Sequence, residues 1–226
     1  MKSILHQTLD RTGTDSVKWD GLERWFRLKS DVLPLWVADI DIRTAPAISE
    51  ALAARAATGE FGYTLFSREA QRAVSSWYGR RHETEVDPNH VLFSNGVVPG
   101  LTQIVEALTE TGDGVVIQSP VYPPFHELVT GLGRELFDAP LEQVDGRFEM
   151  DFVALEESMR QAKLFLLCSP HNPVGRVWTA EELQRVIELA KRHDVIVVAD
   201  EIHADLTFPT QRHVALNRLD SNVITV

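Results

Sequence analysis

The sequence predicts an α/β fold in three layers, with a mostly parallel β-sheet between two layers of helices. Short apolar runs recur along the second part of the chain, at residues 114–118, 164–168 and 195–199. Segments with apolar residues at helical spacing lie between these runs. Strands that alternate with amphipathic helices form βα units, and a strand that is apolar throughout is typical of a parallel sheet covered on both faces.

The composition restricts the class of partner and the compartment. The chain has 226 residues, 44% of them hydrophobic, which is enough for one large domain or two small ones. It carries 22 Lys and Arg against 33 Asp and Glu, a net charge of −11, so nucleic acid and anionic membranes are not expected partners. The sequence shows neither a secretory signal nor an apolar run of about 20 residues. The single cysteine, Cys168, closes an apolar run and is interpreted as a core residue, which fits a cytoplasmic protein.

Residues 1–45 differ from the rest of the chain. They carry scattered charges and tryptophans without regular spacing, and we expect an irregular N-terminal arm or part of a small domain. Residues 46–226 are expected to form the large domain. Pro46 begins a predicted helix that Gly59 ends, and a second helix is predicted over residues 69–81.

The repeating part begins after these helices. The predicted strands are short and rich in apolar or β-branched residues: 91–93, 114–118, 134–139, 164–168, 195–199 and 222–226. Helices are predicted to follow the strands, over residues 101–111, from after Phe125 to about Gly131, and over residues 151–161 and 180–190. Thr179 and Glu182 form a capping box before the last helix, and Asp145-Gly146 predicts a turn. Because the sequence ends on a buried strand, we expect the sheet to be incomplete at the C-terminus and the chain to be one piece of a longer polypeptide.

Polar groups follow several of the predicted strands. Right-handed crossovers bring the carboxyl ends of parallel strands to one edge of the sheet, where ligands bind. Residues 94–98 lie at a helix N-terminus, which favours an anion such as phosphate. Tyr122 lies among prolines and offers a flat ring for stacking. Asn172 can donate its amide to an oxygen, and the carboxylate of Asp200 can hold a ring nitrogen protonated.

Each of these features also has a structural explanation, such as a turn, a loop aromatic, an Asx turn or a helix cap. Four of them on one edge favour a site, because phosphate binding, ring stacking, a hydroxyl donor and a pyridinium partner are the contacts that pyridoxal phosphate requires. No G-x-G-x-x-G follows a strand, so dinucleotide binding is disfavoured. The histidines lack a convincing metal-ligand spacing, and a metal at His203 and Asp205 is disfavoured.

The order of the motifs resembles the fold-type I pyridoxal-phosphate enzymes, and more narrowly the MalY/PatB group of cystathionine β-lyases, also called cysteine-S-conjugate β-lyases. The matching segments are PLWVADID at 34–41, FGYT at 61–64, GVV at 96–98, PVYPPF at 120–125, SPHNPVGRVW at 169–178 and ADEIHADL at 199–206. Class I and II aminotransferases share the fold but usually carry tyrosine three residues after the pyridine-binding aspartate. His203 stands at that position here, which favours the lyase group.

The resemblance implies roles for individual residues. Asp200 and Tyr122 are the catalytic residues that it implies, with Asp200 at the pyridine nitrogen and Tyr122 stacked on the ring. Asn172 would donate to the ring oxygen O3′, and His203 would lie on that side of the ring. The remaining implied contacts are Gly96, Val97 and Val98 at the phosphate, Tyr63 reaching the phosphate of the neighbouring subunit of a homodimer, and Asp39 at the substrate entrance.

The activity implied is that of a pyridoxal 5′-phosphate-dependent carbon–sulfur β-lyase. It would cleave L-cystathionine or related cysteine S-conjugates to a thiol, pyruvate and ammonia. Two alternatives stay open: a class I/II aminotransferase, and a non-catalytic regulatory or binding protein on the same scaffold. The family's Schiff-base lysine follows the last predicted strand and is absent from this sequence, as are the carboxylate-binding arginine and the small domain. We therefore expect this chain alone to be inactive.

Overall fold

The computed structural model describes residues 7–28 and 32–226; residues 1–6 and 29–31, parts of the predicted N-terminal arm, lie outside the described residues. The chain divides into two compact units, Met1–Thr64 and Leu65–Val226. The domain boundary predicted after residue 45 stays a prediction.

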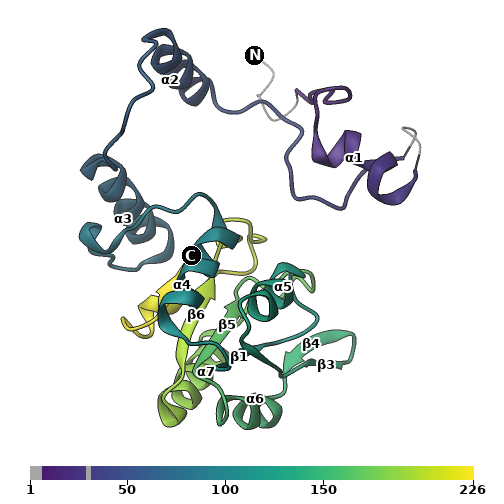
Figure 1. Ribbon diagram of the computed structural model, residues 1–226, viewed down its shortest axis with the longest axis vertical. Helices are drawn as coiled ribbons and strands as arrows, with labels where there is room; N and C mark the ends of the chain where they lie inside the picture. The colour runs from purple at the N-terminus through teal and green to yellow at the C-terminus, as the bar shows by residue number, and fades with distance from the viewer. Residues whose placement is uncertain (1–6, 29–31) are drawn as a thin grey trace. The chain divides into compact units, whose positions relative to one another are not determined.

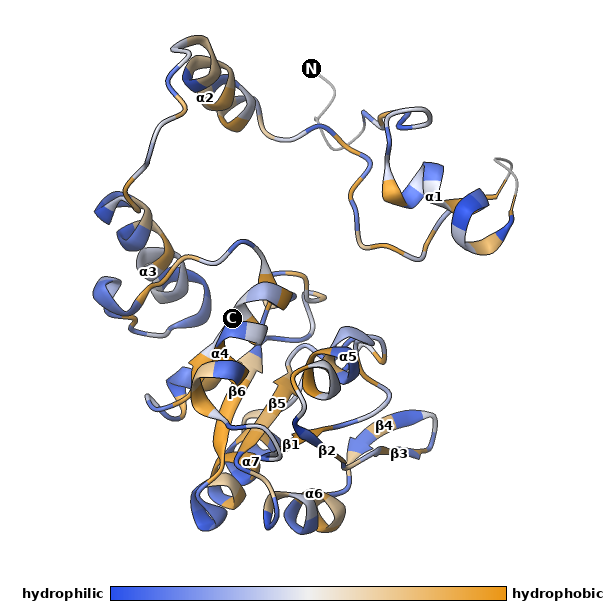
Figure 2. Cartoon of the chain, in the orientation of Figure 1, coloured by the Kyte–Doolittle hydropathy of each residue, from blue (hydrophilic) through white to orange (hydrophobic). Residues whose placement is uncertain are grey.

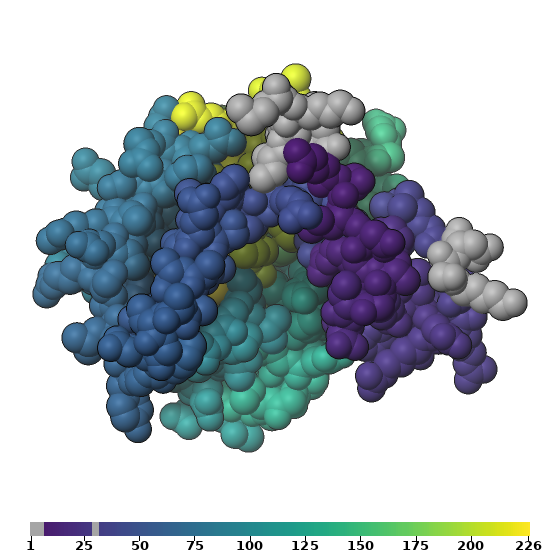
Figure 3. Space-filling view, turned by 90° about the horizontal axis from the view of Figure 1, so that it is seen from above, coloured from purple at the N-terminus to yellow at the C-terminus, as the bar shows by residue number. Residues whose placement is uncertain are grey.

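The first unit contains a helix that the sequence interpretation missed. Residues 1–45 were expected to be irregular, yet α1 (Val17–Phe26) forms there, with the Ser16 side chain accepting a hydrogen bond from the Trp19 amide at its N-terminus. The side chains of the purple α1 segment gather in one compact mass in Figure 3. Lys18 and Trp19 of the helix both bind the Asp41 carboxylate, at 2.6 Å and 2.9 Å. Polar contacts of this kind leave no apolar periodicity, which is why the pattern failed to predict α1. Helix α2 (Pro46–Ala57) begins at Pro46 as predicted.

The second unit is built on a five-stranded sheet with the order β2-β1-β5-β6-β7. Its strands are β1 (Gly114–Ile117), β2 (Glu135–Asp138), β5 (Leu164–Cys168), β6 (Ile196–Asp200) and β7 (Ile224–Thr225). All neighbouring strands in this sheet are parallel, as predicted. Figure 1 shows β5 and β6 side by side, and in Figure 2 both are orange, the colour of hydrophobic residues.

Alternating side chains of these strands enter two separate cores, which confirms the three layers. On one face Ile117, Leu166 and Val198 pack with residues of α4 (Val97–Leu108) and α5 (Pro124–Gly131). On the other face Phe165 and Ala199 pack with residues of α6 (Phe152–Met159) and α7 (Ala180–His193). The sheet therefore lies between α4 and α5 on one side and α6 and α7 on the other.

Two local predictions about strands need correction. Residues 91–93 were predicted to form a strand, but none is present there. Leu92 and Phe93 are 87% and 70% exposed, and a strand needs both a hydrogen-bonding neighbour and a buried face. Conversely, an unpredicted antiparallel hairpin forms from β3 (Leu141–Val144) and β4 (Arg147–Met150). Its turn is the predicted Asp145-Gly146 pair, with φ of 49° and 79°, the positive values that a type I′ turn requires.

The remaining elements of the second unit are α3 (Arg68–His82) and the short 3₁₀ helices η2 (Pro88–His90) and η3 (Leu216–Arg218). Helix α3 extends the predicted helix over residues 69–81 by one residue at each end. No helix among residues 7–28 and 32–226 is long and apolar enough to cross a membrane.

Candidate functional site

The parallel register places Cys168 directly beside Asp200 at the carboxyl ends of β5 and β6. The Cys168 side chain belongs to the core on the α4 and α5 face of the sheet. Side chains alternate along a strand, so Asp200, two residues after Val198 of the same core, faces the same side. The candidate site is therefore the end of the sheet on this face.

Asp200 is a buried carboxylate, only 3% exposed. Its Oδ1 accepts a hydrogen bond of 3.1 Å from the Ile202 amide. Burial raises the pKa of Asp200, and the hydrogen bond from the Ile202 amide opposes this shift. Among the described residues, no Lys or Arg forms an ion pair with Asp200. Because burying an unpaired charge is unfavourable, a ligand that brings a cationic N–H to this carboxylate would be stabilised there.

Tyr122 lies in the loop that follows β1. Its ring packs against the same core as Cys168, edge-on to Phe125 with ring centroids 6.4 Å apart. The loop is anchored at its start because the amide and hydroxyl of Ser119 bind the carboxylate of Asp138, at 2.9 Å and 2.5 Å. The structure thus brings Tyr122 to the face of the sheet that Asp200 occupies.

Asn172 lies in the loop that follows β5 and is held there through Cys168. Its backbone amide donates to the Cys168 sulfur at 3.3 Å. Burial raises the pKa of the Cys168 thiol to about 12, so the thiol stays protonated, which agrees with a core role. The loop after β5 is bound to the last residue of β6, since the Ser169 amide donates to the Asp200 carbonyl at 2.9 Å. Sequence reasoning missed that Cys168 contacts Asn172, although its position just before the loop was a usable signal.

The start of α4 has the form of an anion site. Gly96, the N-cap residue, has φ 124° and ψ 166°, a conformation that L-residues rarely adopt, and no side chain caps the helix. Val97 and Val98 occupy the first turn, where amide groups have no partner within the helix, and Pro99 has no amide hydrogen. Val97 also packs against the core that Tyr122 contacts. Among the residues that the structure describes, no group accepts from the amides of Val97 and Val98, so both can bind an anion such as phosphate.

The geometry described so far does not include the other three predicted site residues, which are His203, Asp39 and Tyr63. His203 is partly buried in the turn after β6, and its carbonyl accepts a 2.9 Å hydrogen bond from the Leu206 amide. Asp39 and Tyr63 belong to the first unit. There the Asp39 carboxylate pairs with Arg11 at 2.5 Å, whereas Tyr63 is fully exposed. The roles of these residues stay predictions.

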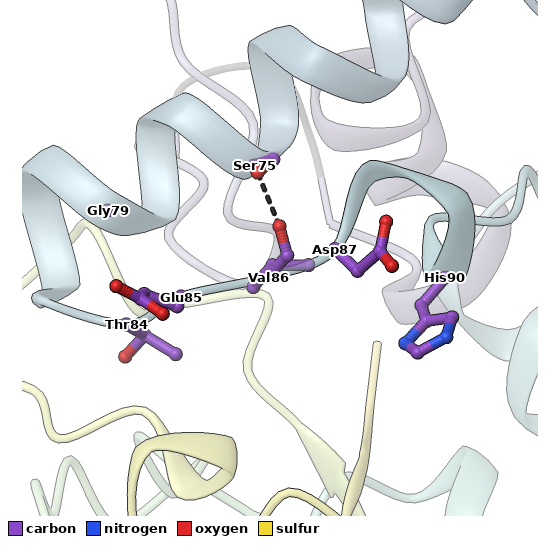
Figure 4. Close-up of a pocket in the computed structure, with 7 residues that line it drawn as sticks. All are labelled: Ser75, Gly79, Thr84, Glu85, Val86, Asp87 and His90. Carbon is purple, nitrogen blue, oxygen red and sulfur yellow. Dashed lines mark hydrogen bonds between the residues drawn. The ribbon is translucent and has the colours of Figure 1, made fainter.

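An open depression of about 590 Å³ lies elsewhere in the second unit (Figure 4). It is lined by α3 and the segment after it: Ser75, Gly79, Thr84, Glu85, Val86, Asp87 and His90. None of the predicted site residues lines it, and the Ser75 hydroxyl is bound to the Val86 carbonyl at 2.5 Å. Within residues 7–28 and 32–226, no cluster of three His, Cys, Asp or Glu side chains could hold a metal ion.

The three-layer fold and the loops at the carboxyl end of its sheet define an α/β protein with the transferase fold of pyridoxal-phosphate-dependent enzymes. More narrowly, the chain belongs to the aminotransferase class I and II family, whose profile matches residues 30–226.

Individual relatives lie on both sides of the lyase and aminotransferase division. Cystathionine beta-lyase PatB of Bacillus subtilis is 45% identical over 206 residues, which cover 90% of this chain and 53% of PatB. The structure of a PLP-bound putative aminotransferase from Clostridium difficile is 34% identical, with a TM-score of 0.93, over 98% of this chain and 58% of that one. Cystalysin from Treponema denticola, which contains pyridoxal 5′-phosphate, is 33% identical, with a TM-score of 0.91, over 97% and 57%. The chain spans about half the length of the curated relatives it matches.

Proposed function

We propose that the natural protein containing this chain is a pyridoxal-phosphate-dependent carbon–sulfur β-lyase. Its substrates would be L-cystathionine or related cysteine S-conjugates, and its products a thiol, pyruvate and ammonia. The observation that carries the proposal is the buried carboxylate of Asp200, which has no Lys or Arg partner among the described residues and lies at the end of β6.

The residues at the sheet edge fit this cofactor by their chemistry. A pyridinium N–H is the kind of cationic donor that the Asp200 carboxylate lacks. The free amides of Val97 and Val98 at the N-terminus of α4 suit a phosphate group, and Gly96 allows the chain to turn before them. Tyr122 offers an aromatic ring on the same face of the sheet.

The cofactor, when bound, supplies an electron sink for the electron pair left at the substrate Cα. The chain's own residues would keep the ring of the cofactor protonated and hold it in a fixed orientation. Asp200 would hold the proton on the ring nitrogen, because opposite charges attract more strongly in the protein interior than in water. Asn172 would donate to the O3′ oxygen, Tyr122 would restrain the plane of the ring, and His203 would lie on the O3′ side.

The assembly and the substrate contacts belong to the same proposal. Tyr63, whose side chain is fully exposed in this chain, would reach the cofactor phosphate of the partner subunit in a homodimer. Asp39 would line the substrate entrance, and the protein would work in the cytoplasm on small amino-acid substrates. The lyase activity is favoured over the aminotransferase activity by the 45% identity to a cystathionine β-lyase and by His203 three residues after Asp200.

The test uses the full-length natural protein, because the chain spans about half the length of its relatives. The protein is incubated with pyridoxal phosphate and L-cystathionine, with and without an α-keto acid. A lyase releases thiol and pyruvate without the keto acid. Product formation only with the keto acid would favour the aminotransferase, and the absence of both bound cofactor and product would favour a binding protein.

A further inference from the structure

His171 connects two loops of the candidate site. It belongs to the loop after β5 and directly precedes Asn172, and it is only 2% exposed. Its Nε2 atom lies 3.1 Å from the carbonyl oxygen of Pro120. Pro120 belongs to the loop after β1, two residues before Tyr122. One imidazole therefore joins the segment of the predicted stacking ring to the segment of the predicted amide donor.

The protonation of this imidazole follows from its surroundings. A carbonyl oxygen only accepts hydrogen bonds, so Nε2 must carry the hydrogen. Burial lowers the pKa of His171 to about 4, so the ring is neutral at physiological pH and its single N–H is on Nε2. The Nδ1 atom has no hydrogen-bond partner among the described residues and therefore carries only a lone pair. The bond to Pro120 is therefore the hydrogen bond that links the ring to the loop after β1.

The rest of His171 is held firmly. Its backbone amide donates to the Arg176 carbonyl at 2.7 Å, and its carbonyl accepts from the Gly175 amide at 2.8 Å. The ring lies edge-on to Trp178, with centroids 5.5 Å apart and planes at 88°. Because the backbone and the ring of His171 are both held in place, the bond from Nε2 also holds Pro120 at a fixed distance from the loop after β5.

We propose that His171 is a positioning residue that sets the separation between Tyr122 and Asn172 by donating from Nε2 to the Pro120 carbonyl. The inference rests on the proposed function, which assigns Tyr122 to the face and Asn172 to the O3′ oxygen of one cofactor ring. His171 itself touches neither cofactor nor substrate in this account. Loss of its N–H frees the loop after β1 and leaves the Pro120 carbonyl without its partner.

Two substitutions of similar size separate the hydrogen bond from the packing. His171→Gln retains an amide N–H at about the distance of Nε2 from the backbone, whereas His171→Met fills a similar volume without a donor. His193→Gln is the matched control, since His193 is a partly buried histidine at the end of α7 whose Nε2 lies 3.0 Å from Glu156. Each variant is made in the full-length natural protein. The cofactor is first removed and pyridoxal phosphate is then titrated back.

The readouts are the dissociation constant for pyridoxal phosphate and the circular dichroism band of the bound cofactor, both recorded well below the melting temperature of each variant. We expect His171→Met to weaken binding about threefold to tenfold, the range for one net hydrogen bond, and to change the band. The dissociation constant of His171→Gln should stay within about twofold of that of the unsubstituted protein. His193→Gln should leave both readouts unchanged.

The outcomes distinguish this inference from the proposed function. If His171→Met lowers only the melting temperature, or if the Gln variant is no better than the Met variant, then His171 has no positioning role. If the unsubstituted protein binds no pyridoxal phosphate, then the proposed function fails, and the role of His171 toward the cofactor fails with it.

Discussion

Replacing Asp200 by Asn is expected to change stability and cofactor affinity in opposite directions. The Asn side chain has nearly the same shape, and its oxygen can still accept the hydrogen bond from Ile202. It cannot ionise, however. The substitution therefore removes the buried charge and leaves the packing of β6 unchanged.

The sign of the stability change follows from the pKa. Burial raises the pKa of Asp200 in the folded chain above its value in the unfolded chain, so ionisation at neutral pH destabilises the fold. Each unit of such a difference corresponds to about 1.4 kcal/mol. We expect Asp200→Asn to increase the free energy of unfolding of the cofactor-free protein by about 1–3 kcal/mol at pH 7, the range for relieving a buried unpaired group. The gain should shrink as the pH falls through the folded-state pKa, because the carboxyl then becomes neutral.

The cofactor responds in the opposite way. Removing one member of a buried charge pair costs about 2–5 kcal/mol, which corresponds to about 30-fold to several-thousand-fold weaker binding of pyridoxal phosphate. Urea denaturation without cofactor and a cofactor titration measure the two effects. Asp220→Asn is the control: a hydrogen bond from Lys191 at 2.7 Å lowers the pKa of Asp220, so this variant should lose stability at pH 7. A less stable Asp200→Asn protein with unchanged affinity would refute the reasoning.

Three further predictions concern single positions. Because burial raises the pKa of Cys168 to about 12, its thiol should be alkylated at pH 8 only when the protein unfolds. Mass spectrometry of the Cys168 peptide measures the labelling, and rapid labelling of the native protein would contradict this prediction. Thr179→Ala removes the acceptor of the Glu182 amide at the start of α7, and urea denaturation should show a loss of about 1 kcal/mol; an unchanged midpoint would mean that the capping box does not stabilise the helix. Gly96→Ala should cost about 1–3 kcal/mol because φ is 124° there, whereas Gly131→Ala should be nearly neutral because no atom lies within 4 Å of the added carbon; equal losses for the two would refute the conformational explanation.

The central layer of the fold was predictable because its physical cause is visible in the sequence. Residues 164–168 are buried on both faces, so every position is apolar and the strand limits match the prediction. The capping box at Thr179 and Glu182 also forms as predicted. The β3–β4 hairpin was missed because most of its side chains are exposed or partly exposed, and only its turn carries a strong signal.

The position of the candidate site at one edge of the sheet was predictable as well, whereas the roles of its residues stay predictions. The rule that parallel strands end on one edge brings Asp200 and the loop of Asn172 together without knowledge of the coordinates. The bond from His171 to Pro120 was not predictable, because its acceptor is a backbone carbonyl and every residue has one. The contact between the Cys168 sulfur and the Asn172 amide was also missed, although the position of Cys168 directly before the loop was a usable signal.

The most direct test is a crystal structure of the full-length natural protein with pyridoxal phosphate bound. We expect the phosphate at the amides of Val97 and Val98, the ring against Tyr122, and the ring nitrogen within ion-pair distance of the Asp200 carboxylate. Cofactor density in the depression beside α3, or a ring nitrogen that faces away from Asp200, would contradict the account.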